Sequence, residues 1–207
     1  MGGRFISLEG GEGAGKSTQL KRLAEALRGR GLEVVETREP GGSPGAEAIR
    51  KLLLEGEEGR WTPEGEALLF AAARADHVAR TIRPALERGA WVLCDRFLDS
   101  SLAYQGGAAG VGMENVRTLH RIGSQDFLPD RTLLLELPGE AVSARLRVRD
   151  AAGSDRIGGR GEEFHLSVAE AFVQLAQEEP QRFRRVDGSG DPEAVTAMLL
   201  AALEDLV

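Results

Sequence analysis

The sequence predicts an α/β fold in which a mainly parallel sheet of about five strands is covered by helices on both faces. Short continuous apolar runs alternate with longer segments whose apolar residues recur every three or four positions, and glycine-rich turn clusters separate them. With 207 residues, 42% of them hydrophobic and 29% charged, the chain is long enough for a substantial core. We expect one domain spanning residues 1–207.

The apolar runs are too short and too continuous for amphipathic helices, so each predicts a buried strand. In chain order, strands are expected at 4–8, 32–36, 90–94, 132–137 and 183–186. Helical periodicity predicts helices at 16–28, 46–54, 64–88, 140–147, 163–177 and 193–206. Ser43, Thr62 and Asp191 each precede a proline. A capping side chain followed by proline at the first helical position is typical of a helix start.

The strongest motif lies between the first strand and the first helix. It comprises Gly10, Gly11, Glu12, Gly13, Ala14, Gly15, Lys16, Ser17 and Thr18, of which the first eight match G-x-x-x-x-G-K-[ST]. Glycines let backbone N–H groups reach phosphate oxygens at the helix N-terminus. Lys16 adds a charge near the transferred phosphate, and Ser17 offers a hydroxyl to the Mg²⁺ that accompanies the nucleotide. Spacing and context together favour a P-loop NTPase three-layer fold that binds a nucleotide. The alternative, a glycine-rich turn with a purely structural role, is disfavoured.

A P-loop alone does not choose a reaction. The base-reading motif of guanine-specific switch proteins is absent, because the only asparagine, Asn115, is followed by valine. The catalytic-loop and Asp-Phe-Gly motifs of protein kinases are absent too. A net charge of -7 and a pI near 5.2 argue against nucleic-acid polymers or membranes as partners. We expect a cytoplasmic location, since no signal peptide is readable and the single Cys94 cannot form an internal disulfide.

Four blocks of sequence carry a resemblance to a known family. They are residues 10–18, Thr-Arg-Glu-Pro-Gly-Gly at 37–42, Leu-Leu-Phe-Ala-Ala-Ala-Arg at 68–74, and the stretch from Asp-Arg-Phe to Ala-Tyr-Gln-Gly at 95–106. Over nearly its whole length the chain resembles the bacterial thymidylate kinases. The resemblance implies a homodimer that transfers the γ-phosphoryl group of MgATP to dTMP in dTTP biosynthesis. The alternatives are a kinase for another nucleotide or a deoxynucleoside, and a noncatalytic nucleotide sensor.

The resemblance also implies a base site. Phe70 would stack on thymine, although helical periodicity alone favours core packing for it. Arg74, four residues later, would read the base edge, with a solvated helix arginine as the alternative. Ser101 and Gln105 would contact the base or phosphate. Tyr104 would occupy the space of a ribose 2′-hydroxyl, unless it is a plain core or surface residue.

Charged residues next to the strands are expected to hold the acceptor phosphate and the metal. Arg96 follows a strand at its carboxyl end, where its two-point geometry suits a phosphate. Arg38, also just past a strand, is the second clamp, and Arg50 is the third. Asp95 is assigned to the water shell of Mg²⁺. The resemblance turns Glu12 toward the acceptor 3′-hydroxyl, which explains a carboxylate beside phosphates.

A basic, glycine-containing stretch at about 149–162 is expected to form a mobile lid, since Asp155-Arg156-Ile157 resembles the family's lid signature. Gly13 stands where some relatives carry an arginine, so the lid must supply the transition-state cation, from Arg156 or else Arg149. Without the resemblance, a solvated loop of balanced charges is an equal alternative.

The acceptor phosphate is mostly a dianion at neutral pH, so the transfer needs no general base. We therefore expect catalysis by positioning and charge neutralisation. Lys16, Mg²⁺, Arg96 and Arg156 would align the phosphates, while Glu12 and Phe70 orient the acceptor.

Overall fold

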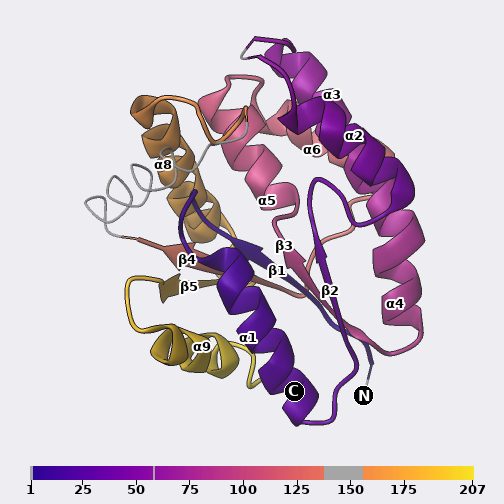
Figure 1. Ribbon diagram of the computed structural model, residues 1–207, viewed down its shortest axis with the longest axis vertical. Coiled ribbons are helices and arrows are strands. Elements are labelled where there is room, and N and C mark those ends of the chain that lie inside the picture. The colour runs from indigo at the N-terminus through magenta and orange to yellow at the C-terminus, as the bar shows by residue number, and fades with distance from the viewer. Residues whose placement is uncertain (1, 58, 138–155) are drawn as a thin grey trace.

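The computed structural model describes residues 2–57, 59–137 and 156–207. Within them, parallel strands form one sheet in the order β2-β3-β1-β4-β5 (Figure 1). The strands are β1 (Phe5–Glu9), β2 (Val34–Arg38), β3 (Trp91–Asp95), β4 (Arg131–Glu136) and β5 (Phe183–Asp187). The fold class and all the predicted strands are confirmed, with ends that differ from the expected ones by one or two residues at most.

Helices cover both faces of the sheet (Figure 1). One face packs against α1 (Lys16–Gly29) and α9 (Pro192–Ala201), with Leu23 and Leu199 in their shared core. The other face is covered by α4 (Arg83–Glu87), α5 (Leu98–Ser101), α6 (Met113–Ser124) and α8 (Glu162–Glu178). Next to them lie α2 (Pro44–Leu54) and α3 (Pro63–His77), which pack against each other. These two layers enclose the sheet as the sequence predicts.

The three predicted helix caps are confirmed. The side chains of Ser43, Thr62 and Asp191 accept hydrogen bonds from backbone N–H groups in the first turns of α2, α3 and α9. Such a cap satisfies one of the donors that a helix start leaves unpaired. The helix expected at 64–88 is found as α3, the π-helical segment η1 (Val78–Ile82) and α4 in continuous succession. The helix expected at 140–147 lies outside the described residues.

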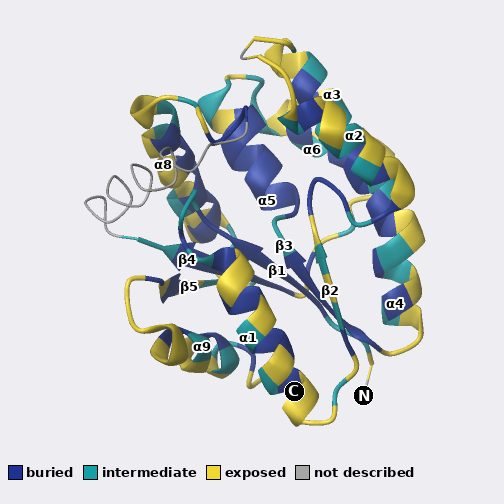
Figure 2. Ribbon diagram, viewed as in Figure 1, coloured by how far each residue is buried: buried dark blue, intermediate teal, exposed yellow. Residues whose placement is uncertain are grey.

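The sequence prediction missed the helical region between β3 and β4. It contains α5, the π-helical segment η2 (Leu102–Ala108) and α6. Every residue of α5 is buried, three of them polar, so the segment has no amphipathic period to detect (Figure 2). The helix expected at 193–206 ends earlier, at Ala201.

The parallel sheet places three loops at one edge. Because its strands all run the same way, the carboxyl ends of β1, β2 and β3 meet there. In the register, Asp95 at the end of β3 lies beside Arg38 of β2 on one side and Leu8 of β1 on the other. The residues that follow these strands are therefore brought together. No helix in the described part of the chain is long and apolar enough to cross a membrane.

Candidate active site

The loop after β1 curls tightly around the start of α1. Gly10, Gly13 and Gly15 all have positive φ, at 138°, 72° and 86°. A Cβ at Gly10 would lie 2.3 Å from the carbonyl oxygen of Leu135, so only glycine fits there. Helix α1 begins at Lys16 without a side-chain cap. A helix start of this kind, preceded by glycines, suits an anion.

Lys16 lies folded against this loop. Its Nζ donates to the carbonyl oxygens of Gly10 at 3.1 Å and Gly11 at 2.8 Å. Burial lowers the pKa of Lys16 to about 8, because a buried ammonium loses its hydration. The ammonium is thus held at the mouth of the glycine loop.

Ser17 and Asp95 face each other across the end of the sheet. Ser17 Oγ donates to Asp95 Oδ2 at 2.6 Å. The pair offers two hard oxygen ligands beside the loop, the type that Mg²⁺ prefers. Among the described residues, no cluster of three or more His, Cys, Asp or Glu side chains could hold a metal. A cation here would therefore take its other ligands from water and nucleotide.

Arg96 ties the end of β3 to the glycine loop. Its Nη2 lies 2.7 Å from Glu12 Oε1 and donates to Tyr104 Oη at 3.1 Å. Its Nη1 donates to the carbonyl of Gly10 and to Ser100 Oγ, at 3.1 and 3.0 Å. The backbone of Arg96 has φ 70°, a left-handed conformation that is unusual outside glycine. Its contacts hold the guanidinium at the mouth of the loop in spite of that backbone strain.

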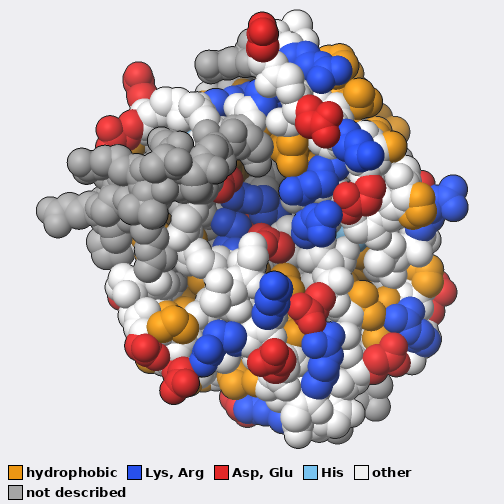
Figure 3. Space-filling model, viewed as in Figure 1, with side chains coloured by type: hydrophobic (Ala, Val, Ile, Leu, Met, Phe, Trp, Pro, Cys, Tyr) orange, Lys and Arg blue, Asp and Glu red, His pale blue; other side chains and the backbone are white. Residues whose placement is uncertain are grey.

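A pocket of about 430 Å³ opens beside the glycine loop. All eight residues predicted for the acceptor site line it, namely Arg38, Arg50, Phe70, Arg74, Arg96, Ser101, Tyr104 and Gln105. From the loop, its lining includes Glu12, Gly13, Gly15, Lys16, Ser17 and Thr18. In Figure 3, Lys and Arg side chains gather around a hollow in this face of the molecule. The structure therefore brings the predicted phosphate and base residues into one cavity.

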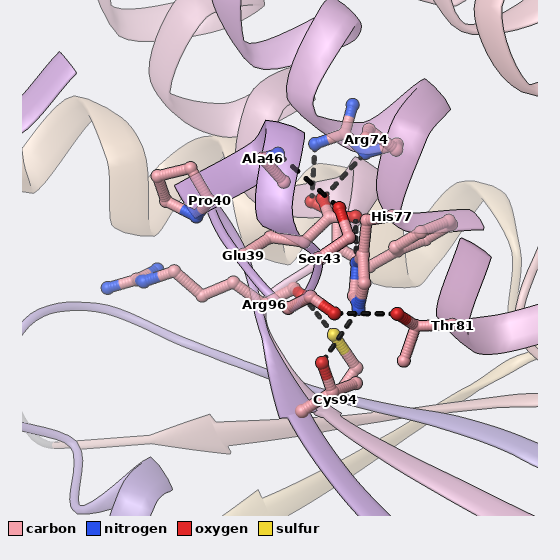
Figure 4. Close-up of polar contacts among 12 residues, drawn as sticks. Glu39, Pro40, Ser43, Ala46, Arg74, His77, Thr81, Cys94 and Arg96 are labelled. Atoms are coloured by element: carbon pink, nitrogen blue, oxygen red, sulfur yellow. Dashed lines mark hydrogen bonds and ion pairs between the residues drawn. The ribbon is translucent and has the colours of Figure 1, made fainter. Parts of the chain in front are cut away.

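Arg74 is anchored in the pocket wall (Figure 4). Its Nε donates to Glu39 Oε2 at 2.7 Å, and its Nη2 donates to Ser101 Oγ at 2.7 Å and the Phe97 carbonyl at 3.2 Å. His77 Nδ1 lies 3.0 Å from the other oxygen of Glu39. Because only 2% of the Arg74 side chain is exposed, the alternative of a solvated arginine is wrong.

The remaining predicted residues differ in how firmly they are held. Phe70 is half-buried and packs against the core while it lines the pocket, so core packing is confirmed and stacking on thymine stays a prediction. Tyr104 is buried, and burial raises the pKa of its phenol. Arg38 is half-exposed and pairs with Glu47 at 3.1 Å. Arg50 donates to the carbonyl oxygen of Pro40 at 2.7 Å.

Arg156 lies outside the lining of the pocket. Its guanidinium is bound to the carboxylate of Glu66 and to the carbonyl of Leu53, and 2% of the side chain is exposed. It does not line the pocket, so the structure does not bring it to Lys16 and Arg96. Arg149 and Asp155 lie outside the described residues. The role of a lid arginine stays a prediction.

Sequence reasoning missed three buried glutamates around the site. Glu9 accepts hydrogen bonds from Phe97 N and Ser100 Oγ, and burial, with Asp99 nearby, raises its pKa to about 7. Glu39 holds Arg74, and Glu66 holds Arg156. Glu9 lies directly before the glycine loop, Glu39 lies within Thr-Arg-Glu-Pro-Gly-Gly, and Glu66 lies one helical turn before Phe70. Their positions next to these motifs could have indicated a role at the site.

Comparisons with known proteins agree with this geometry. The sequence profile described as "Thymidylate kinase" matches residues 8–199. The chain is 64% identical over 207 residues to the thymidylate kinase of Rhizorhabdus wittichii, covering 100% of both chains. It is 47% identical to that of Caulobacter vibrioides, covering 99% of this chain and 96% of the relative.

A comparison with solved structures leads to the same family. The crystal structure of thymidylate kinase from Ehrlichia chaffeensis superposes with a TM-score of 0.81 at 30% identity, over 99% of this chain and 100% of that one. These matches favour the kinase over a noncatalytic sensor and over kinases for other acceptors. The chain belongs to the thymidylate kinase family, enzymes that transfer a phosphoryl group from ATP to dTMP.

Proposed function

We propose that the pocket beside the glycine loop is the dTMP site of this kinase and that the loop holds the phosphates of ATP. Thymine stacks on Phe70, and its edge meets Arg74 with Ser101 and Gln105. The acceptor phosphate lies at Arg96, with Arg38 and Arg50 as further cations. The observation that carries the proposal is that all these side chains line one cavity, which ends at the loop.

The two cations proposed to act on the phosphates converge on one atom. Lys16 Nζ and Arg96 Nη1 each donate to the carbonyl oxygen of Gly10, both at 3.1 Å. Donor and acceptor phosphates repel one another, and two positive charges at their meeting point offset that repulsion and the charge that develops during transfer. No general base is required, because the acceptor is already a dianion.

Ser17 and Asp95 are the residues proposed to hold Mg²⁺, directly or through its water shell. When bound, Mg²⁺ neutralises phosphate charge and fixes the orientation of the nucleotide. The close oxygens of this pair and the lack of a larger acidic cluster in the described part of the chain fit an ion shared with nucleotide and water.

Glu12 is proposed to orient the acceptor sugar through its 3′-hydroxyl. Its Oε1 lies 2.7 Å from Arg96 Nη2 and accepts from Tyr104 Oη at 3.3 Å. The guanidinium stabilises a carboxylate that nearby phosphates would otherwise repel. Arg156 is proposed as the cation supplied to the transition state, which requires it to leave Glu66. Arg160 Nη2, 2.7 Å from the same oxygen of Glu66, then remains as the ion-pair partner of that carboxylate.

Replacing Phe70 with leucine tests the base site. Leucine keeps most of the apolar volume against the core but removes the flat face, so stacking alone is lost. We expect KM for dTMP to rise roughly 5- to 150-fold, as about 1–3 kcal/mol of stacking implies. Steady-state kinetics with dTMP and ATP varied in turn measure it. KM for ATP should not change. An unaltered KM for dTMP would mean that Phe70 only packs the core.

The homodimer that the resemblance implies has a suitable surface on α3. Leu68 is 56% exposed there, Ala72 is exposed one turn later, and Ala79 is exposed on the following segment η1. The neighbouring helix α6 adds Ile122, which is 76% exposed. Exposed large apolar side chains on neighbouring helices are typical of protein interfaces. We propose that two copies pair through α3 and α6, in the cytoplasm.

Leu68→Glu is expected to convert the dimer to monomer, because it buries a charge in the apolar interface. Sedimentation velocity measures the mass in solution. The matched control is Leu166→Glu, since Leu166 lies on α8 and is 51% exposed. The control should remain dimeric. A dimeric Leu68→Glu protein would place the interface on another surface.

A further inference from the structure

The buried carboxylate of Glu66 links Gln105 to two arginines, Arg156 and Arg160. Only 1% of its side chain is exposed. One oxygen, Oε1, accepts from Gln105 Nε2 at 3.0 Å. The other, Oε2, is bound by Arg156 and, at 2.7 Å, by Arg160 Nη2. Glu66 lies on α3 one turn before Phe70, and Gln105 lies on η2, so the carboxylate bridges two walls of the acceptor pocket.

The two arginines fix the direction of the carboxylate. Guanidinium groups only donate hydrogen bonds, so Oε2 is committed to them. Arg156 is itself held by the end of α2, since its Nε donates to the Leu53 carbonyl at 2.8 Å. With one oxygen committed in this way, Oε1 is the atom that remains for Gln105.

The carboxylate in turn fixes the orientation of the Gln105 amide. A side-chain amide has one donor end and one acceptor end, and a carboxylate only accepts. The Nε2 group of Gln105 must therefore point to Glu66. Its carbonyl oxygen then faces away from Glu66, and among the described residues none donates a hydrogen bond to it. Gln105 lines the pocket, which thus presents an acceptor at this point.

We propose that Glu66 is a positioning residue for base selection: through its bond to Gln105 it keeps the amide carbonyl turned toward the acceptor base. This rests on the proposed placement of the thymine edge. Thymine and uracil carry an N–H at position 3, which a carbonyl oxygen accepts, whereas cytosine carries a bare ring nitrogen there. Arg74, a donor, matches the 4-carbonyl of the same bases. The pocket edge is therefore complementary to an imide and opposed to an aminopyrimidine.

Glu66→Gln makes a sharp test, because it keeps the shape and removes one acceptor. The new amide must turn its oxygen to the arginines, so its NH₂ group faces Gln105. Gln105 then has to turn over and presents its own NH₂ group to the base. We expect the ratio of kcat/KM for dTMP to that for dCMP to fall about 10- to 100-fold. The ratio of dTMP to dUMP should stay constant, since both share the imide edge.

Gln105→Met and the double variant Glu66→Gln/Gln105→Met complete a cycle. Gln105→Met alone should lower the dTMP to dCMP ratio, and adding Glu66→Gln should lower it no further. Glu66→Asp, which keeps the charge and shortens the reach to Gln105, serves if Glu66→Gln does not fold. Its ratio should also fall.

The outcomes separate the two proposals. A wild-type ratio in the folded Glu66 variants, with a reduced ratio in Gln105→Met, overturns the role of Glu66 alone. A wild-type ratio in Gln105→Met overturns the placement of the base edge and the role of Glu66 with it. A parallel loss for dTMP, dUMP and dCMP in Glu66→Gln overturns base selection in favour of a purely structural role.

Discussion

Lys16→Ala is expected to lower kcat about 10²- to 10³-fold, which is the loss typical when one preorganised donor is removed from a developing charge. Lys16 is the only lysine in the loop, and its ammonium lies at the Gly10 carbonyl together with Arg96. Alanine is a good helix former, so α1 should still begin at this residue. ADP release at saturating ATP and dTMP measures the effect.

The matched control is Lys21→Ala, which removes the same charge from an exposed position on α1. It should leave kcat within about twofold, since an exposed charge at a distance is screened. A Lys16→Ala enzyme with wild-type kcat would show that the loop binds nucleotide without taking part in transfer.

The largest stability effect is expected for Arg74→Met. This change removes the guanidinium from Glu39 and leaves a buried carboxylate whose remaining side-chain contact among the described residues is His77 Nδ1. Breaking a buried ion pair from one side costs about 3–5 kcal/mol of unfolding free energy. For a chain of this size that lowers Tm by roughly 6–20 °C. Chemical unfolding followed by the fluorescence of the buried Trp91 measures it.

Arg80→Met on the same helical run is the control. Arg80 pairs with Asp76 at 2.6 Å, but its side chain is 67% exposed. Removal of an exposed ion pair costs about 1 kcal/mol or less. Equal losses for the two variants would mean that the bond to Glu39 contributes no more to stability than a surface pair.

Most of the fold could be predicted from local sequence patterns. The strand from Trp91 to Asp95 was predictable because a parallel strand buried on both faces is a continuous apolar run. The start of α2 was predictable because Ser43 and Pro44 act within a few residues of each other. Helix α5 gave no such signal, since it buries polar residues against the core. Helix α6 did carry an amphipathic pattern, with buried Val116, His120 and Ser124 spaced by four, and the prediction missed it.

The partners of the site residues were beyond sequence reasoning. Arg74 binds Glu39 from 35 positions away, and Arg156 binds Glu66 from 90 positions away. These pairings depend on how α2, α3 and the region before α8 pack, which no single-sequence pattern encodes. The motifs therefore identified the residues around the pocket, and Glu12 beside Arg96, but not Glu39 and Glu66, which bind Arg74 and Arg156.

The backbone of Arg96 lowers the stability of the fold, and its side-chain contacts offset that cost. At φ 70° its backbone energy is about 1 kcal/mol or more above that of a relaxed residue, a cost that glycine would not bear. Glycine would also remove the guanidinium that binds Glu12, Gly10 and Tyr104. A library screened only for heat resistance would therefore gain little from glycine at this position, because the loss of a part-buried ion pair and its hydrogen bonds offsets the relieved strain. A library screened for growth on dTMP phosphorylation would hold the arginine fixed.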